Sequence, residues 1–275
     1  MKNNKVICDT DFYDNVGFNT IRSWLGEHCL CSLNGGYFQK LEPLSNKIEI
    51  EESQSLSDEL LASIQRNSPV PLEVFPNITK TFSILEISGS QLNADHFREL
   101  YQILNCARCI KQALKKNVFP LWHMNSRNLL NSIVALSSIE KVFDDTFQLK
   151  PNASKELKQL SSAIISMEVK INDTMAKLMN WARSKNWLQG DQIVWRNGRS
   201  MLPLKVSQKR KIKGIVQDQS TTGQTAYIEP LEIIELNNQL TELKFERMEE
   251  EIRILRELTA YFRPMAGKIK ESFYI

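Results

Sequence analysis

Residues 193–206 read IVWRNGRSMLPLKV, and this stretch decides the fold because it interrupts a chain whose pattern is otherwise helical. Apolar residues alternate on both sides of Asn197-Gly198, a dipeptide that accepts the positive φ angles of a type I′ turn. The stretch therefore predicts a β-hairpin. Pro203 lacks the N–H that a strand ladder uses, so the second strand is expected at an edge of its sheet.

Two further strands are expected after the hairpin. Gly214-Ile215-Val216 and Thr225-Ala226-Tyr227-Ile228 are short apolar segments, and the polar turn DQSTTGQ separates them. Short strands joined by turns form antiparallel sheets. The chain between residues 193 and 228 is therefore expected to form one small antiparallel sheet.

A long amphipathic pattern lies on each side of this predicted sheet. From Asn152 to Trp181, and again from Leu236 to Phe262, apolar residues recur mostly at spacings of three and four. Such stripes are typical of an antiparallel coiled pair, and also of ordinary bundle helices. The sequence predicts two long antiparallel helices with the sheet inserted between them.

The first 150 residues are expected to form a helical bundle. Asn93 is a predicted N-cap, and its helix is expected to continue to about Lys116. Another helix is expected from Ser126 to Phe143. The fold class is thus mainly α, with a helical core over 1–150, an ascending helix over 151–188, a β tip over 189–230 and a descending helix over 231–275.

Composition excludes the extreme classes of protein. The 275 residues are 42% hydrophobic and 24% charged, which is ordinary for a globular chain. Apolar runs are shorter than the roughly 18 to 20 residues of a membrane span, and the start MKNNKVICDTDFYDN lacks the apolar segment of a signal peptide. A cytoplasmic protein with no membrane partner is expected.

The cysteines raise the question of a zinc site. Cys106 and Cys109 are spaced as a Cys-x-x-Cys pair, and His28, Cys29 and Cys31 could supply further ligands. The one-residue spacing of the second group is poor for chelation, and the first pair lies in a helical segment, so buried thiols are expected and no metal. We likewise find no residue to assign as acid, base or nucleophile.

Positive charge is concentrated in one short segment. The net charge is only +3, yet the segment from Gln192 to Gln217 holds seven basic residues and no acidic one. Lys and Arg bind phosphates of any sequence by releasing condensed counterions. The expected nucleic-acid-binding residues are Arg196, Arg199, Lys205, Lys209, Arg210, Lys211 and Lys213. The alternative is a solvated charge run that balances the acidic helix after Glu229.

The same region resembles the bacterial MutS-two family, the MutS paralogues that lack the mismatch-reading amino-terminal domain. The matching positions are Arg196, Asn197, Gly198, Arg199, Pro203, Lys205, Gly214, Ile215, Val216, Asp218, Ser220, Gly223, Thr225, Ile228, Glu229, Pro230, Leu236, Asn237 and Asn238. The earlier stretch LEISGSQLNADHFRELYQIL is similar to the family's core domain. The chain departs from the family pattern at Trp195, Ser200, Gln217 and Gln224, where Ser200 replaces a tyrosine.

This resemblance implies a helical core, a lever of long helices and a clamp at its end; in the wider MutS family two clamps close around duplex DNA. It also implies an ATPase domain that uses ATP and magnesium, often a nuclease domain, and roles in suppressing recombination and handling stalled ribosomes. The sequence has no G-x-x-x-x-G-K-[ST] loop, so no cofactor or catalytic site is expected in this chain. The departures from the family pattern leave three alternatives open: a fragment, a diverged gene product or a complete protein.

The leading functional hypothesis is therefore a non-catalytic clamp-and-lever module that binds nucleic acid as a homodimer. Phosphate contacts carry no base information, so duplex DNA and structured RNA of the ribosome both remain open as partners. The alternative hypothesis is a scaffold whose two long helices dimerise or bind another helical protein.

Overall fold

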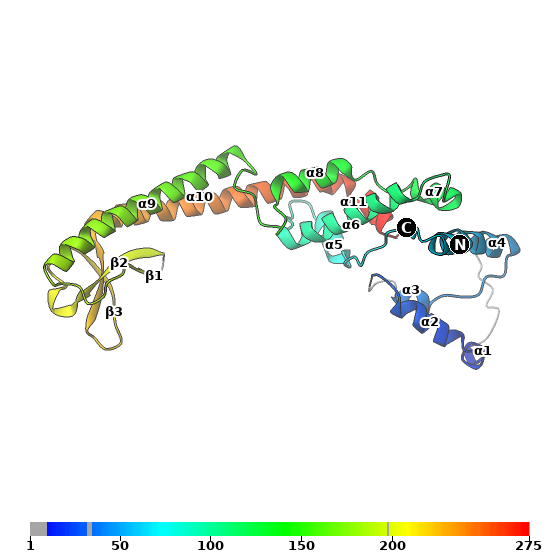
Figure 1. Cartoon of the computed structure of the whole chain (residues 1–275), viewed down its shortest axis with the longest axis horizontal. Coiled ribbons are helices and arrows are strands. Elements are labelled where there is room, and N and C mark those ends of the chain that lie inside the picture. Colours follow the sequence, from blue (N-terminus) through cyan, green and yellow to red (C-terminus); the bar gives the residue numbers. More distant parts are fainter. Residues whose placement is uncertain (1–9, 32–34, 197, 275) are drawn as a thin grey trace. The chain divides into compact units, whose positions relative to one another are not determined.

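The computed structural model describes residues 10–31, 35–196 and 198–274. These residues form two compact units: unit 1 combines the chain up to Leu149 with the chain from Leu255, and unit 2 runs from Lys150 to Ile254. Most of the described residues are helical, and the strands form one small antiparallel sheet (Figure 1). The predicted mainly α fold class is confirmed.

Unit 1 is helical throughout its regular structure. Its helices are α1 (Thr10–Asn15), α2 (Phe18–Glu27), α3 (Gly35–Gln39), α4 (Lys47–Gln65), α5 (Thr79–Glu86), α6 (Ala94–Ala113), α7 (Pro120–Ser126), α8 (Ile133–Val142), the end of α10 (Leu231–Phe262) and α11 (Ala266–Tyr274). Asn93 is the N-cap of α6, as predicted: its side chain accepts the backbone N–H of His96, and the His96 ring accepts that of Asn93.

The helix predicted from Ser126 to Phe143 is present as α8, but its predicted start is wrong, because α7 ends at Ser126 and α8 begins only at Ile133. Between them, backbone groups bond to other helices instead of to a helical ladder. The Leu129 carbonyl accepts from Lys111 Nζ at 2.8 Å, and the Leu130 N–H donates to Ser272 Oγ at 2.9 Å. Tertiary hydrogen bonds thus override the local helical pattern.

Aromatic side chains from three helices form the centre of the unit 1 core. Phe97 of α6 lies 5.5 Å from Phe143 and 6.0 Å from Phe262 of α10, measured between ring centroids. All three are buried. The tilted and edge-on arrangements are favourable for aromatic pairs. α10 also supplies Leu236 and Leu240 to the core of unit 2, so this one helix contributes to both cores.

The Arg263 side chain connects the chain after α10 to the end of α5 and to the loop that follows it. It donates to the carbonyls of Leu85 and Ser90 at 3.1 and 3.0 Å. We expect Arg263→Met to lower the free energy of unfolding by about 2 kcal/mol, because charged hydrogen bonds each contribute roughly 1.5 to 3 kcal/mol. Denaturant titration measures the change. Arg256→Met, at an exposed site on α10, is the matched control and should have almost no effect.

In unit 2, α9 (Lys155–Ser184) packs antiparallel to the first part of α10. Lys244 of α10 pairs with Glu168 of α9 at 2.9 Å, and Glu250 lies against Ser154, the N-cap of α9. The helices are antiparallel because Glu250, which follows Lys244 on α10, contacts Ser154, which precedes Glu168 on α9. Buried apolar side chains of both helices form a single core with one face of the sheet.

Glu250 contributes a pH-dependent part of the stability of unit 2. Hydrogen bonds from Arg253, and then from Ser154, lower the pKa of its carboxyl group below the ordinary 4.5, against the opposing effect of burial. A depressed carboxyl pKa stabilises the fold above the unfolded pKa, and this contribution is lost as pH falls through the folded pKa. We expect the stability difference between the wild type and Glu250→Gln to be largest near neutral pH and to shrink below about pH 4.5, as measured by urea titrations at several pH values.

The sheet contains β1 (Val194–Arg196), β2 (Arg199–Lys205), β3 (Gly214–Gln219) and β4 (Thr225–Pro230) in the spatial order β1-β2-β4-β3. The predicted hairpin is confirmed, since Val194 pairs with Met201 and Arg196 with Arg199. Gly198 has the expected positive φ of 75°, whereas Asn197 lies outside the described residues.

The prediction that Pro203 places β2 at an edge is wrong, because β2 lies between β1 and β4. Pro203 lies beyond the three residues of β2 that pair with β1. Its carbonyl accepts the N–H of Gln189 at 2.9 Å, so the irregular segment before β1 borders it there. The proline is tolerated because no regular strand lies on that side to need its missing N–H.

Candidate nucleic-acid interface

The loop between β2 and β3 carries three exposed cations, Arg210, Lys211 and Lys213. We define the basic loop as residues 206–213; it contains a short 3₁₀ helix (Val206–Gln208). Ile212 is only 7% exposed and joins the core of unit 2. Its burial fixes the loop, while its neighbours Lys211 and Lys213 remain exposed.

Four predicted site residues lie in this loop, and in the described part of the chain none of them pairs with a carboxylate. They are Lys209, which is half-buried, and Arg210, Lys211 and Lys213, which are exposed. A cation with no internal counterion remains available to an external anion. The structure therefore brings these four together as the candidate phosphate contacts.

The other three predicted residues already have partners within unit 2. Arg196 pairs with Asp218 at 2.9 Å and lies 4.3 Å from the centre of the Tyr227 ring. Lys205 Nζ donates to the carbonyl and the side-chain oxygen of Asn186, at 3.1 and 2.8 Å. These contacts occupy the two cations without burying them.

Arg199 belongs to a polar cluster around the buried Glu229 carboxylate, which we call the Glu229 network: Glu229, Arg199, Gln217, Asn237 and Asn238. One oxygen of Glu229 accepts from Arg199 at 2.7 Å and from Asn237 at 2.8 Å, and the other accepts from Gln217 at 2.7 Å. Arg199 also donates to Asn238 at 2.6 Å. The Glu229 side chain is 0% exposed and that of Arg199 is 31% exposed.

This network explains several positions that carry the family resemblance. Gly214 fits because a Cβ there would lie 2.2 Å from the carbonyl oxygen of Glu229. Ser200 is buried and donates to Asn237 at 3.3 Å, so the position of the family's tyrosine faces the protein interior here. In the sequence, Glu229, Asn237 and Asn238 stand out only as positions of the family motif. Their place in one motif with Arg199 is the signal that the four residues share a site.

The thiols offer no metal site among the residues described. No group of three or more His, Cys, Asp or Glu side chains in that part of the chain is arranged to hold an ion. Cys31 is buried, and Cys106 is half-buried. Burial raises the pKa of the Cys106 thiol, which keeps it protonated and weakly reactive.

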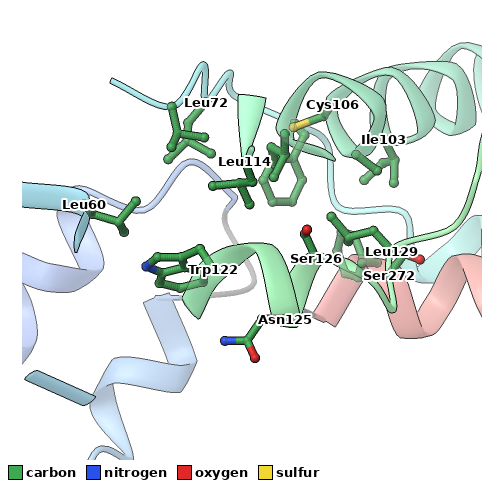
Figure 2. A pocket seen from close by; sticks show the side chains of 15 residues that line it. Leu60, Leu72, Ile103, Cys106, Leu114, Trp122, Asn125, Ser126, Leu129 and Ser272 are labelled. Atoms are coloured by element: carbon green, nitrogen blue, oxygen red, sulfur yellow. The ribbon is translucent and has the colours of Figure 1, made fainter. Parts of the chain in front are cut away.

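A cavity of about 310 Å³ lies in unit 1 among α4, α6, α7, α11 and the loop that includes Leu72 (Figure 2). Its lining is mainly apolar, with Leu60, Ile103 and Trp122 among the side chains, and includes no Lys, Arg, Asp or Glu. A nucleotide phosphate needs cations or clustered backbone N–H groups. The chemistry of this cavity therefore does not match a nucleotide or a nucleic acid.

No helix within residues 10–31, 35–196 and 198–274 is long and apolar enough to cross a membrane.

The chain is similar to endonuclease MutS2 proteins of several bacteria. It is 29% identical to endonuclease MutS2 of Alkaliphilus oremlandii over 93% of its length, 29% identical to that of Aquifex aeolicus over 93%, and 28% identical to that of Finegoldia magna over 97%. The chain spans about a third of the length of these curated relatives. No family model matches it. The resemblance to the MutS-two family is thus confirmed, and the chain is similar to a part of endonuclease MutS2 proteins.

Proposed function

We propose that this chain is a nucleic-acid-binding module of a MutS-like DNA-processing protein, and that it binds phosphates through the basic loop. The observation that carries the proposal is the group of four cations in the basic loop that have no carboxylate partner in the described chain. Its relatives are named endonuclease MutS2, which supports DNA as the polyanion. The binding sequence is unspecified, because phosphate contacts position a partner without reading bases.

The two long helices and the sheet together form the proposed lever and clamp. In this role the sheet contacts the nucleic acid, and α9 and α10 carry it. The module is non-catalytic, and any ATP hydrolysis, magnesium requirement or nuclease activity would belong to other parts of a longer protein. We place its work in the cytoplasm, on duplex DNA or on structured RNA such as that of the ribosome.

The direct test is titration of the chain with a labelled DNA duplex at several salt concentrations, followed by competition with structured RNA and with ribosomal particles. Binding should weaken steeply between about 50 and 200 mM salt, because each phosphate contact releases counterions. A chain that binds neither duplex nor RNA at about 50 mM salt contradicts the proposal. The competition decides which nucleic acid is preferred.

Exposed apolar side chains on the long helices favour a second candidate function, a dimerisation or protein-interaction scaffold. Ile165 and Val169 are 63% and 54% exposed on α9, and Phe245 and Met248 are 55% and 48% exposed on α10. Exposed apolar groups on helices can mark protein interfaces. Light scattering tests this candidate: a stable homodimer that lacks nucleic-acid affinity favours it over the first.

A further inference from the structure

We propose that Glu229 and Arg199 are positioning residues that fix the β1–β2 hairpin on helix α10. The link to binding rests on the proposed function, since the hairpin would present the exposed Trp195 to a nucleic acid bound by the basic loop. The structural part does not depend on it. Arg199 is thereby assigned a role distinct from the phosphate contact that its charge alone predicts.

The hairpin needs such a support because its own pairing is short. β1 has three residues, pairs only with β2, and includes the exposed Trp195 and Arg196. A two-stranded hairpin is marginally stable by itself in water. From Leu202 onward β2 is held by β4 and by the core of unit 2, so the turn end of the hairpin depends on other contacts.

The Glu229 network supplies contacts of this kind, since its members lie on β2, β3, β4 and α10. Arg199 on β2 joins Glu229 on β4 to Asn238 on α10 with its two terminal nitrogens. Ser200, the next residue of β2, donates to Asn237 of α10. A guanidinium holds two partners in a fixed plane, whereas an ammonium is a single point charge. Arg199 therefore joins the hairpin to the helix as well as to the sheet, whereas Arg196 joins it only to the sheet, through Asp218 and Tyr227.

The burial of Glu229 makes the network depend on each of its contacts. A fully buried carboxylate requires a counter-charge and hydrogen bonds to both oxygens, and Arg199, Asn237 and Gln217 provide them. Glu229 thus holds Arg199 in one place. Loss of Arg199 leaves the carboxylate without its cation and removes the direct bridge between β2 and Asn238.

Hydrogen exchange on the free chain tests the structural part. In Arg199→Gln and Arg199→Lys we expect amide exchange in residues 194–200 to rise at least about tenfold more than in residues 202–205 and α9, whose smaller rise reports the lower overall stability of unit 2. Arg247→Gln, which removes an exposed pair with Glu251 on α10, is the control and should leave the hairpin unchanged. Unchanged exchange in the hairpin, or an equal rise throughout unit 2, would overturn the proposal.

Salt-dependent binding to a DNA duplex tests the positioning role. Arg199→Gln and Arg199→Lys should both weaken binding about tenfold through lost preorganisation, with the slope of log affinity against log salt unchanged. A slope that falls by about 1 in Arg199→Gln, with full rescue by lysine, would make Arg199 a phosphate contact and overturn the assignment. If the wild type binds no nucleic acid, the proposed function fails, while the exchange experiment still decides whether Arg199 fixes the hairpin.

Discussion

Replacing Lys209, Arg210, Lys211 and Lys213 together with alanine is expected to lower affinity for a DNA duplex by about three orders of magnitude at 0.1 M salt. Each phosphate contact adds roughly 0.9 to the slope of log affinity against log salt. Four contacts therefore add about 3.6 to this slope. They raise the affinity by about 3.6 orders of magnitude when the salt concentration falls from about 1 M to about 0.1 M. Fluorescence anisotropy at several salt concentrations measures both the affinity and the slope.

The matched control removes the same charge from the same unit at a different place. Lys155, Lys158, Lys170 and Lys177 are exposed on α9, and alanine is well tolerated in a helix. This second quadruple variant should retain most of the affinity and the slope. Equal losses in both variants would show that only net charge matters, and no loss in the first would remove the basic loop from the interface.

Arg199→Gln is expected to lower the free energy of unfolding of unit 2 by on the order of 3 kcal/mol, because it leaves the fully buried Glu229 carboxylate without a cation. Because Arg199 is partly exposed, we expect a loss of stability near the lower end of the range for buried ion pairs that lose one partner. Glu229→Gln should cost less, since the remaining guanidinium can turn toward water. Urea titration followed by far-ultraviolet circular dichroism measures both changes.

A double-mutant cycle separates the charge pair from the rest of the network. The combined Arg199→Gln, Glu229→Gln variant should be more stable than Arg199→Gln alone, because the uncompensated charge is gone. Arg247→Gln removes an exposed pair on α10 and should change stability by roughly 0 to 1 kcal/mol. Additive effects of the two single substitutions would show that the two side chains do not interact.

Local patterns in the sequence were sufficient for the elements whose determinants are local. The Asn-Gly turn between alternating apolar residues predicts the hairpin, the stripes predict α9 and α10, and Asn93 predicts the start of α6. The break between α7 and α8 escaped prediction because its cause is tertiary: Lys111 and Ser272, distant in sequence, take the backbone groups there.

The candidate site was predictable as a region but not residue by residue. Seven basic residues within one segment indicate the site. The partners of Arg196, Arg199 and Lys205, however, lie outside that segment. Asp218 follows it directly, and Glu229 reaches Arg199 only after the sheet has formed. The division of the seven cations into the four of the basic loop and the three that make internal contacts therefore requires the register of the strands.

The participation of α10 in two cores has a consequence for cooperativity. Leu236 and Leu240 of this helix are buried in one core, and Leu258 and Phe262 in the other. Fraying of α10 from either side would withdraw side chains from a packed interior, so the thermal transitions of the two units should be thermodynamically coupled. The boundary between the units falls inside α10, so cutting the chain there would divide a helix that contributes to both cores.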